Sequence, residues 1–96
     1  MIIKHALLRV SDGKKSHFEA AMAEARPLIA ASPGFIDIEV RPSVEGAGTY
    51  LLLVRWNSVA DHRDGFRTSS RYEQWRGLLH DFYDPLPEVG YFGDPL

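Results

Sequence analysis

The sequence predicts an α+β domain of the ferredoxin-like class, in which helices pack on an antiparallel four-stranded sheet. Segments with apolar residues at every second position are interspersed with segments whose apolar residues recur every three or four positions, in the order β-α-β-β-α-α-β. The chain of 96 residues is long enough for one domain and too short for two, and it contains no repeat or linker. We therefore treat residues 1–96 as a single domain.

Residues 1–10 are expected to form the first strand, with apolar positions on both of its faces. One face carries Ile2, Ala6, Leu8 and Val10, and the other carries Ile3, His5, Leu7 and Arg9. A helix follows, because an apolar stripe at helical spacing runs over Phe18, Met22, Ala25 and Ile29. Its start has two candidates, Asp12 as the cap or Ser16 with Glu19 as a capping box. Pro27 is expected to bend the last turns, and the Ser-Pro-Gly run at residues 32–34 ends the helix.

The next two strands form a predicted hairpin. Residues 35–41 alternate between apolar and polar side chains, which is typical of an edge strand. Residues 49–56 are apolar on nearly both faces, which indicates a central strand covered on both sides. Gly46 and Gly48 lie in the connection between them.

The second helical region is predicted to consist of two segments with a break near Ser69. Ser58 with Asp61 and Ser70 with Glu73 each have the spacing of a capping box. The second segment carries an apolar stripe over Tyr72, Trp75, Leu79 and Phe82. Residues 88–92 are expected to add a short last strand.

Composition excludes several classes of function. The net charge of −2 argues against a nucleic-acid or anionic-membrane partner. No apolar run approaches the roughly 20 residues of a membrane span, and the first ten residues do not resemble a signal peptide. The absence of cysteine excludes thiolate chemistry and fits a reducing compartment, so we expect a cytoplasmic protein. The four histidines lack metal-site spacing, so no metal is expected.

The predicted sheet also indicates a partner. Helices that follow the first and third strands cover only one sheet face, while both strands offer apolar residues to two faces. An uncovered apolar face of this size is rare in a monomer. We therefore expect a homodimer in which sheet packs against sheet.

Candidate site residues concentrate in residues 61–80. His62 lies four residues before Phe66 on one helix face, and Arg67 lies at the expected break, where its guanidinium could turn inward toward an anionic oxygen. His5, a polar residue on an apolar strand, is a further candidate base. The large aromatics Phe66, Trp56, Tyr72 and Trp75 could wall an aromatic ligand, although core packing explains them equally well.

Four runs, "SPGF", "YLLLVRW", "HRDGFRTSSRYEQWRGLL" and "PEVGYF", resemble the antibiotic biosynthesis monooxygenase domain family over essentially the whole chain. The resemblance implies a dimeric α+β barrel with a pocket between sheet and helices in each subunit. Haem-degrading members carry an asparagine on the first strand and an axial histidine on the last helix. Here Ala6 or His5 and Arg76 stand near those positions, with His80 one turn further on, so both haem features are missing or displaced.

These features lead to a specific hypothesis. We expect a cofactor-independent monooxygenase that oxidises a small phenolic or polyketide-like aromatic with O₂. The catalytic residues are His62, Arg67 and His5, and the substrate contacts are Trp75, Phe66, Trp56 and Tyr72. The first alternative is a non-catalytic dimeric module that binds a small ligand or has a structural role. The second is a haem-degrading oxygenase, which the missing or displaced haem features disfavour. A pocket lined by His5, His62 and Trp75 would favour chemistry, whereas a packed interior would favour the non-catalytic module.

Overall fold

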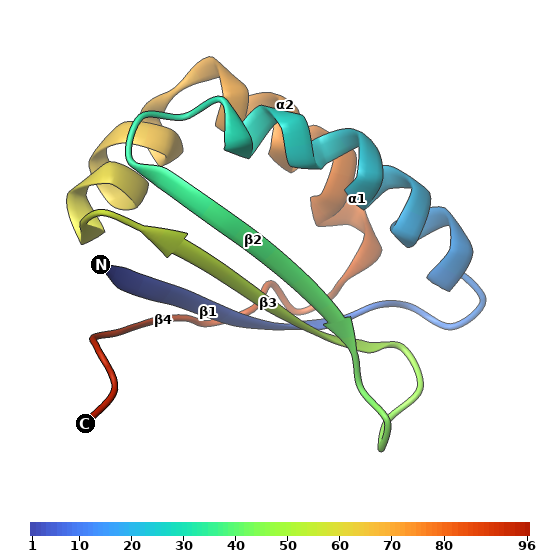
Figure 1. Ribbon diagram of the computed structural model, residues 1–96. Helices are drawn as coiled ribbons and strands as arrows, with labels where there is room; N and C mark the ends of the chain where they lie inside the picture. The colour runs from blue at the N-terminus through green and yellow to red at the C-terminus, as the bar shows by residue number, and fades with distance from the viewer.

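The computed structural model describes residues 1–96 and confirms the predicted α+β class (Figure 1). In chain order the elements are β1 (Ile2–Arg9), α1 (Lys15–Ala30), β2 (Phe35–Pro42), β3 (Thr49–Trp56), η1 (Asp61–Gly65), η2 (Phe66–Thr68), α2 (Ser70–Leu79), η3 (His80–Phe82) and β4 (Val89–Phe92). Both long helices lie on the same side of the sheet, so the molecule has two layers. None of the helices combines the length and apolar character that crossing a bilayer requires.

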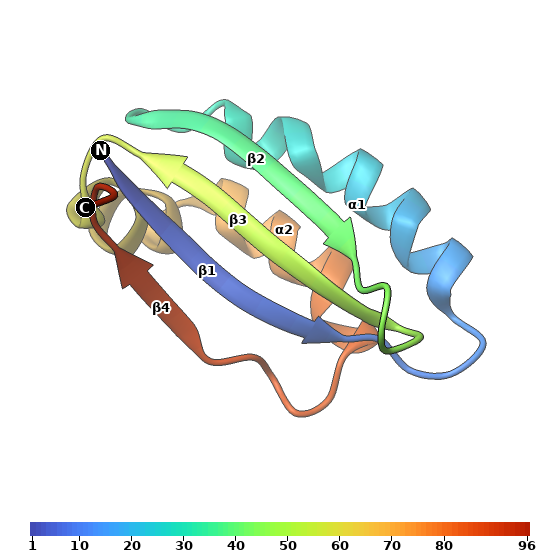
Figure 2. The ribbon, with the colours of Figure 1, turned by 60° about the horizontal axis from the view of Figure 1, so that its bottom comes forward.

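All neighbouring strands of the sheet are antiparallel, in the order β2-β3-β1-β4 (Figure 2). The β1–β3 register runs from Ile2 opposite Trp56 to Arg9 opposite Thr49. β1 and β3 therefore occupy the centre, as their apolar patterns predict, and β2 and β4 form the edges. β2 contains a bulge between Phe35 and Asp37, a common feature of edge strands.

The core lies between the sheet and the helices. The predicted stripe of α1 is buried, namely Phe18, Met22, Ala25 and Ile29. It meets the inward residues of the central strands, which are Ala6, Leu8 and Val10 on β1 and Tyr50, Leu52, Val54 and Trp56 on β3. Because full burial of one large apolar side chain stabilises by about 1.5–3 kcal/mol, this layer is the main source of stability.

The start of α1 differs from both sequence-based expectations. The helix begins at Lys15, and Lys14 occupies the cap position without a side-chain hydrogen bond. Neither Asp12 nor Ser16 caps it. Glu19, the expected partner in a capping box, instead accepts a 2.6 Å hydrogen bond from the hydroxyl of Tyr50. The carboxylate of Glu19 therefore binds Tyr50 of β3 and not the backbone at the start of α1.

The turn after α1 requires a glycine. Gly34 has a φ of +82°, a conformation that side chains disfavour. A Cβ atom built on this residue would lie 2.2 Å from Cγ of Asp61. The glycine therefore permits both the chain reversal into β2 and the close approach of η1.

The second helical region is broken as predicted, and the cap lies one residue earlier than expected. Ser69 has extended backbone angles, and its hydroxyl accepts a hydrogen bond from the backbone N–H of Tyr72. Ser69, and not Ser70, is therefore the N-cap of α2. In the first segment Ser58 does cap, because its hydroxyl accepts from the N–H of Asp61. The following turn, η1, is π-helical and is succeeded by the 3₁₀ turn η2.

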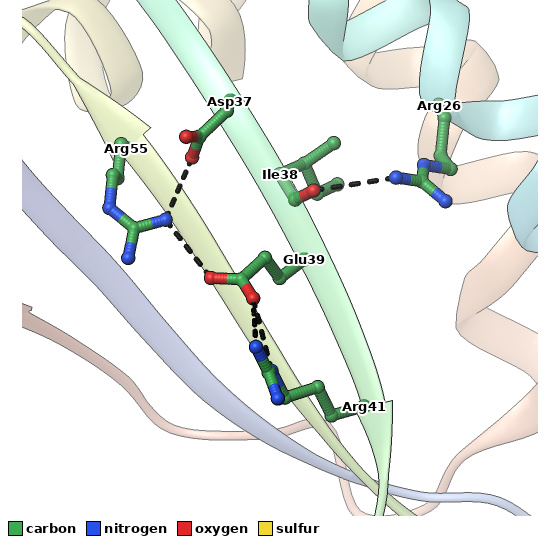
Figure 3. A network of polar contacts seen from close by, with 6 residues as sticks. All are labelled: Arg26, Asp37, Ile38, Glu39, Arg41 and Arg55. Atoms are coloured by element: carbon green, nitrogen blue, oxygen red, sulfur yellow. Dashed lines mark hydrogen bonds and ion pairs between the residues drawn. The ribbon is translucent and has the colours of Figure 1, made fainter.

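The sheet face opposite the helices is open. Leu7 is 42% exposed and Phe92 is 57% exposed there. A polar network borders the apolar centre: Arg55 bonds both Asp37 and Glu39, and Glu39 also pairs with Arg41 (Figure 3). Asp37, Glu39 and Arg41 lie on the edge strand β2, while Arg55 and the half-buried leucines lie on the neighbouring central strand β3.

Candidate functional site

A cavity of about 120 Å³ lies between the sheet and the second helical region. Its lining comes from every part of that region, from three strands and from the segment before β4: Lys4, Ala6, Leu8, Leu52, His62, Phe66, Arg67, Tyr72, Trp75, His80, Tyr83, Leu86, Pro87 and Val89. Apolar side chains predominate, and no aspartate or glutamate is present. The site is therefore an apolar chamber with a few polar groups, the usual character of a small-molecule pocket.

His62 is held in this cavity by a partner far away in the sequence. Its ring is only 2% exposed, and Nδ1 lies 2.7 Å from the hydroxyl oxygen of Tyr91 on β4. The rings of Phe66 and Tyr91 lie 6.3 Å and 5.6 Å from it between centroids. These contacts fix the imidazole plane and leave Nε2 without a hydrogen bond to the protein.

The surroundings keep His62 neutral. Its pKa is lowered from 6.5 to about 3, chiefly by burial and to a smaller extent by the positive charges of Lys4 and Arg67. Burial also raises the pKa of Tyr91, so the tyrosine retains its proton. When Nδ1–H donates to the Tyr91 oxygen, Nε2 has a free lone pair and becomes a proton acceptor.

Arg67 turns toward the cavity, as the sequence analysis predicted. It belongs to η2, and its guanidinium carbon lies 5.3 Å from the centroid of the Tyr72 ring. This distance is within cation–π range. Arg67 lines the cavity and is also exposed, so it stands at the opening. Its neighbours in the predicted ridge differ: Arg63 pairs with Asp64, and Arg71 bonds Ser32.

Three of the four predicted aromatics form one wall of the cavity. Phe66 packs edge to face against Tyr72 and against Trp75, with centroid distances of 5.5 Å and 5.9 Å. Edge-to-face packing of this kind is a favoured arrangement of aromatic rings and fixes their orientation. Phe66 and Trp75 are nearly fully buried, so the wall is part of the core as well as of the cavity.

Two predicted site residues lie elsewhere. Trp56 is fully buried behind His62 and Phe66, at centroid distances of 5.6 Å and 6.0 Å, and it does not line the cavity. Its Nε1–H has no hydrogen-bond partner. His5 lies on the open sheet face, where its ring meets the ring of Phe92 edge to face at 5.8 Å. The strand alternation that directs Ala6 to the cavity directs His5 away from it.

Several polar residues of the site were not predicted from the sequence, among them Lys4 and Tyr91. Lys4 is 7% exposed, occupies an inward-facing position on β1 and lines the cavity. Its position between Ile2 and Ala6 on the inward face was a usable signal, but a lysine is normally assigned to the surface. Tyr91 had no local signal, because its role depends on β4 pairing with β1, which places Tyr91 opposite Lys4.

The structure offers no cluster of three or more histidine, aspartate or glutamate side chains that could hold a metal ion. The polar groups of the cavity are instead two cations, two histidines and two tyrosine hydroxyls. Such a set can bind an anion, accept a proton and orient a ring.

The fold and cavity define a class: a ferredoxin-like α+β domain with a partly open, cationic, aromatic-walled chamber beneath its helices. The comparison with known proteins makes the class specific. The profile of the antibiotic biosynthesis monooxygenase family matches residues 1–78, and the chain belongs to that family.

Individual proteins resemble the chain in sequence or in fold. The uncharacterized protein YczJ of Bacillus subtilis (strain 168) is 40% identical over 94 residues, which cover 98% of this chain and 99% of YczJ. The crystal structure of a Bordetella bronchiseptica protein described as belonging to the same family is 32% identical, with a TM-score of 0.94 over 99% of this chain and 97% of that one. SnoaB of Streptomyces nogalater, a cofactor-independent oxygenase, shares the fold at 16% identity, with a TM-score of 0.82 over 99% of this chain and 94% of SnoaB.

Proposed function

We propose that this protein is a cofactor-independent monooxygenase that oxidises a small phenolic compound with O₂. The observation that carries the proposal is the placement of His62, whose Nδ1 is held by Tyr91 while the ring borders a chamber walled by aromatic residues. Family membership and the fold shared with the cofactor-independent oxygenase SnoaB support it.

The proposed reaction begins with removal of one proton from the substrate by Nε2 of His62. General-base assistance of this type typically contributes about 10² to 10⁴ in rate. The low pKa of His62 makes it a weak base in the empty site. Because Lys4 and Arg67 help to lower that pKa, an anion that forms between the two cations raises it again and favours the transfer.

The substrate anion then acts as the reductant. It transfers one electron to O₂, and recombination of the substrate radical with superoxide forms a carbon–oxygen bond. His62 returns the proton to the peroxide, and the hydroperoxide loses water to leave a carbonyl group. One oxygen atom enters the product and the other leaves as water, so no external reductant is consumed. The apolar lining excludes bulk water and the aromatic wall positions the ring.

Haem chemistry does not suit this cavity. A volume of about 120 Å³ is well below the roughly 300–1,000 Å³ of pockets that enclose drug-sized ligands, and a haem is at least that large. The position expected for an axial ligand is Arg76, which is exposed, while His80 borders the chamber beside Tyr72 and Tyr83.

Oxygen consumption with simple single-ring phenols, in the presence of a metal chelator, tests the proposal. We expect consumption that depends on substrate and protein, and that falls about 10²-fold or more in His62→Gln with little change in ligand affinity. Binding without oxygen consumption across the series would reject the oxygenase and favour a non-catalytic binding module.

We also propose that the protein is a homodimer formed through the open sheet face. The apolar centre of this face contains the exposed Leu7 and Phe92, and Leu53 of β3 lies opposite His5 in the middle of the sheet. Light scattering should give the mass of two chains at micromolar concentration. Leu53→Glu should shift the mass toward one chain, whereas Val44→Glu, at a fully exposed hairpin position, should not. A single-chain mass for the unaltered protein would reject the dimer.

A further inference from the structure

Lys4 is a buried cation without a partner in the protein. It projects from β1 toward the helices, is 7% exposed, and makes no hydrogen bond or ion pair with another residue. Buried lysines are almost always paired, because an isolated ion costs several kcal/mol to remove from water. A lysine that borders a cavity under these conditions is placed to meet a charge supplied from outside the chain.

The surroundings of Lys4 contain no negative charge. The ionisable groups that line the cavity around it come from five parts of the chain: His62, Arg67, Tyr72, His80 and Tyr83, together with its cross-strand neighbour Tyr91. None is a carboxylate. Arg67 adds a second cation at the opening, and no carboxylate pairs with it. The site therefore has an excess of positive charge within an apolar chamber, where electrostatic attraction is stronger than in water.

We infer that Lys4 holds the charged oxygen of the substrate, and that the site binds a single-ring organic anion such as a phenolate or an enolate. The inference rests on the proposed function, since it names a binding residue and the substrate class for the same site. Lys4 binds the anion directly, and Arg67 neutralises charge at the opening.

The size and lining of the chamber favour one ring over a larger or an inorganic anion. A cavity of about 150 Å³ holds benzene in an engineered protein, and this chamber has about 120 Å³. One aromatic ring therefore fills it with little adjustment, whereas a fused polycyclic substrate does not fit. The wall of Phe66, Tyr72 and Trp75 gives stacking surface that an inorganic anion would not use.

The proton affinity of Lys4 agrees with this role. Burial, and after it the charge of Arg67, lowers the pKa of Lys4 to about 8. Lys4 is therefore mostly protonated at neutral pH and loses its charge just above it. A bound anion should raise this pKa, and the ammonium group should in turn lower the pKa of a bound phenol. That second effect makes proton transfer to a weakly basic His62 feasible.

Binding of 4-nitrophenol tests the inference directly, because its phenol and phenolate forms differ in colour. We expect the unaltered protein to bind the phenolate about ten to a hundred times more tightly than the phenol, as expected for one hydrogen bond to a charged group. Lys4→Met should abolish most of this preference while retaining binding of the neutral phenol. Lys15→Met, at an exposed lysine on α1, is the matched control and should behave like the unaltered protein. Equal affinity for the two forms, or a preference that survives in Lys4→Met, would overturn the inference.

Two further measurements complete the test. The chain contains only three lysines, so carbon-13 signals from labelled lysine resolve Lys4 from the exposed Lys14 and Lys15. The Lys4 signal should titrate near pH 8 and move to higher pH when the dye binds; an unmoved midpoint counts against direct contact, even if Lys4→Met does not fold. Inorganic phosphate should displace the dye far less well than benzoate. Equal displacement would show that the site selects charge without selecting a ring.

Oxygen uptake with simple phenols, measured on the same protein samples, separates this inference from the proposed function. A Lys4-dependent preference for phenolate without oxygen uptake supports the anion site and rejects the oxygenase. Oxygen uptake without such a preference supports the oxygenase and rejects the anion site at Lys4.

Discussion

Replacement of Lys4 by methionine should stabilise the folded protein at neutral pH. The pKa of Lys4 falls from 10.5 to about 8 on folding, and burial is the main cause. Each pKa unit corresponds to about 1.36 kcal/mol, so the charged form costs about 3 kcal/mol in the free energy of folding. Methionine has a similar length, carries no charge, and can occupy the same apolar chamber.

The effect should depend on pH in a defined direction. Below pH 8 both the folded and unfolded states carry a protonated Lys4, and the full cost is present. Between about pH 8 and pH 10.5 the folded state has lost the proton while the unfolded state retains it, so the stability of the unaltered protein rises with pH. The advantage of Lys4→Met should therefore shrink by more than about 2 kcal/mol between pH 7 and pH 10.

Urea unfolding at pH 7 and pH 10, at one fixed protein concentration, measures both quantities. Lys15→Met controls for loss of one surface charge, and it should change stability by less than about 0.5 kcal/mol. A Lys4→Met protein that is less stable than the unaltered one at pH 7 would refute the reasoning. So would a stability difference that is the same at both pH values, since titration of Lys4 could then not be its cause.

Three other changes probe the surrounding structure. The pKa of His62 is lowered from 6.5 to about 3, so the unaltered protein should lose stability as pH falls through that range. Urea unfolding at pH 7 and pH 4 should show a smaller loss of stability for His62→Gln. An equal loss in the two proteins would contradict this. Gly34→Ala combines a positive φ with a steric clash and should lower the melting temperature more than Gly13→Ala, which has a positive φ and open space; equal shifts would show that the clash is relieved. Ser69→Ala should lower the free energy of unfolding in urea by about 1 kcal/mol, whereas Ser70→Ala should leave it almost unchanged. The opposite order would show that Ser70 is the N-cap.

Much of the fold was accessible from local patterns. The apolar residues on both faces of residues 1–10 and 49–56 predicted two strands, the second of them central, and the stripe beginning at Phe18 predicted the buried face of α1. The break near Ser69 was likewise predicted from cap spacing. These features depend on side-chain direction within a few residues, which backbone geometry sets directly. The cap of α2 was misplaced by one residue, because the Ser70–Glu73 spacing of a capping box favoured Ser70 over Ser69.

Some residues of the site were likewise predictable from local patterns, and others were not. Helical spacing predicted that His62 and Phe66 share one face, and the break near Ser69 predicted an inward Arg67; both pairs of features meet at the cavity, together with Trp75, which was predicted from its flat ring. His5 was included on chemical type alone, and the strand direction excludes it from the cavity. Trp56 was included for its size, and packing places it one layer behind the wall.

The contacts that give the cavity its chemistry were decided by tertiary structure. The hydrogen bond between His62 and Tyr91 joins residues 29 positions apart, and it exists because β4 pairs with β1 beneath η1. Lys4 borders the same cavity as His62 and Arg67 because the second helical region packs over β1. A residue type and its periodicity determine which way a side chain points from its own element. What it meets there, and therefore its charge state, is determined by the elements that pack opposite, because burial and neighbouring charges act through space and not along the chain.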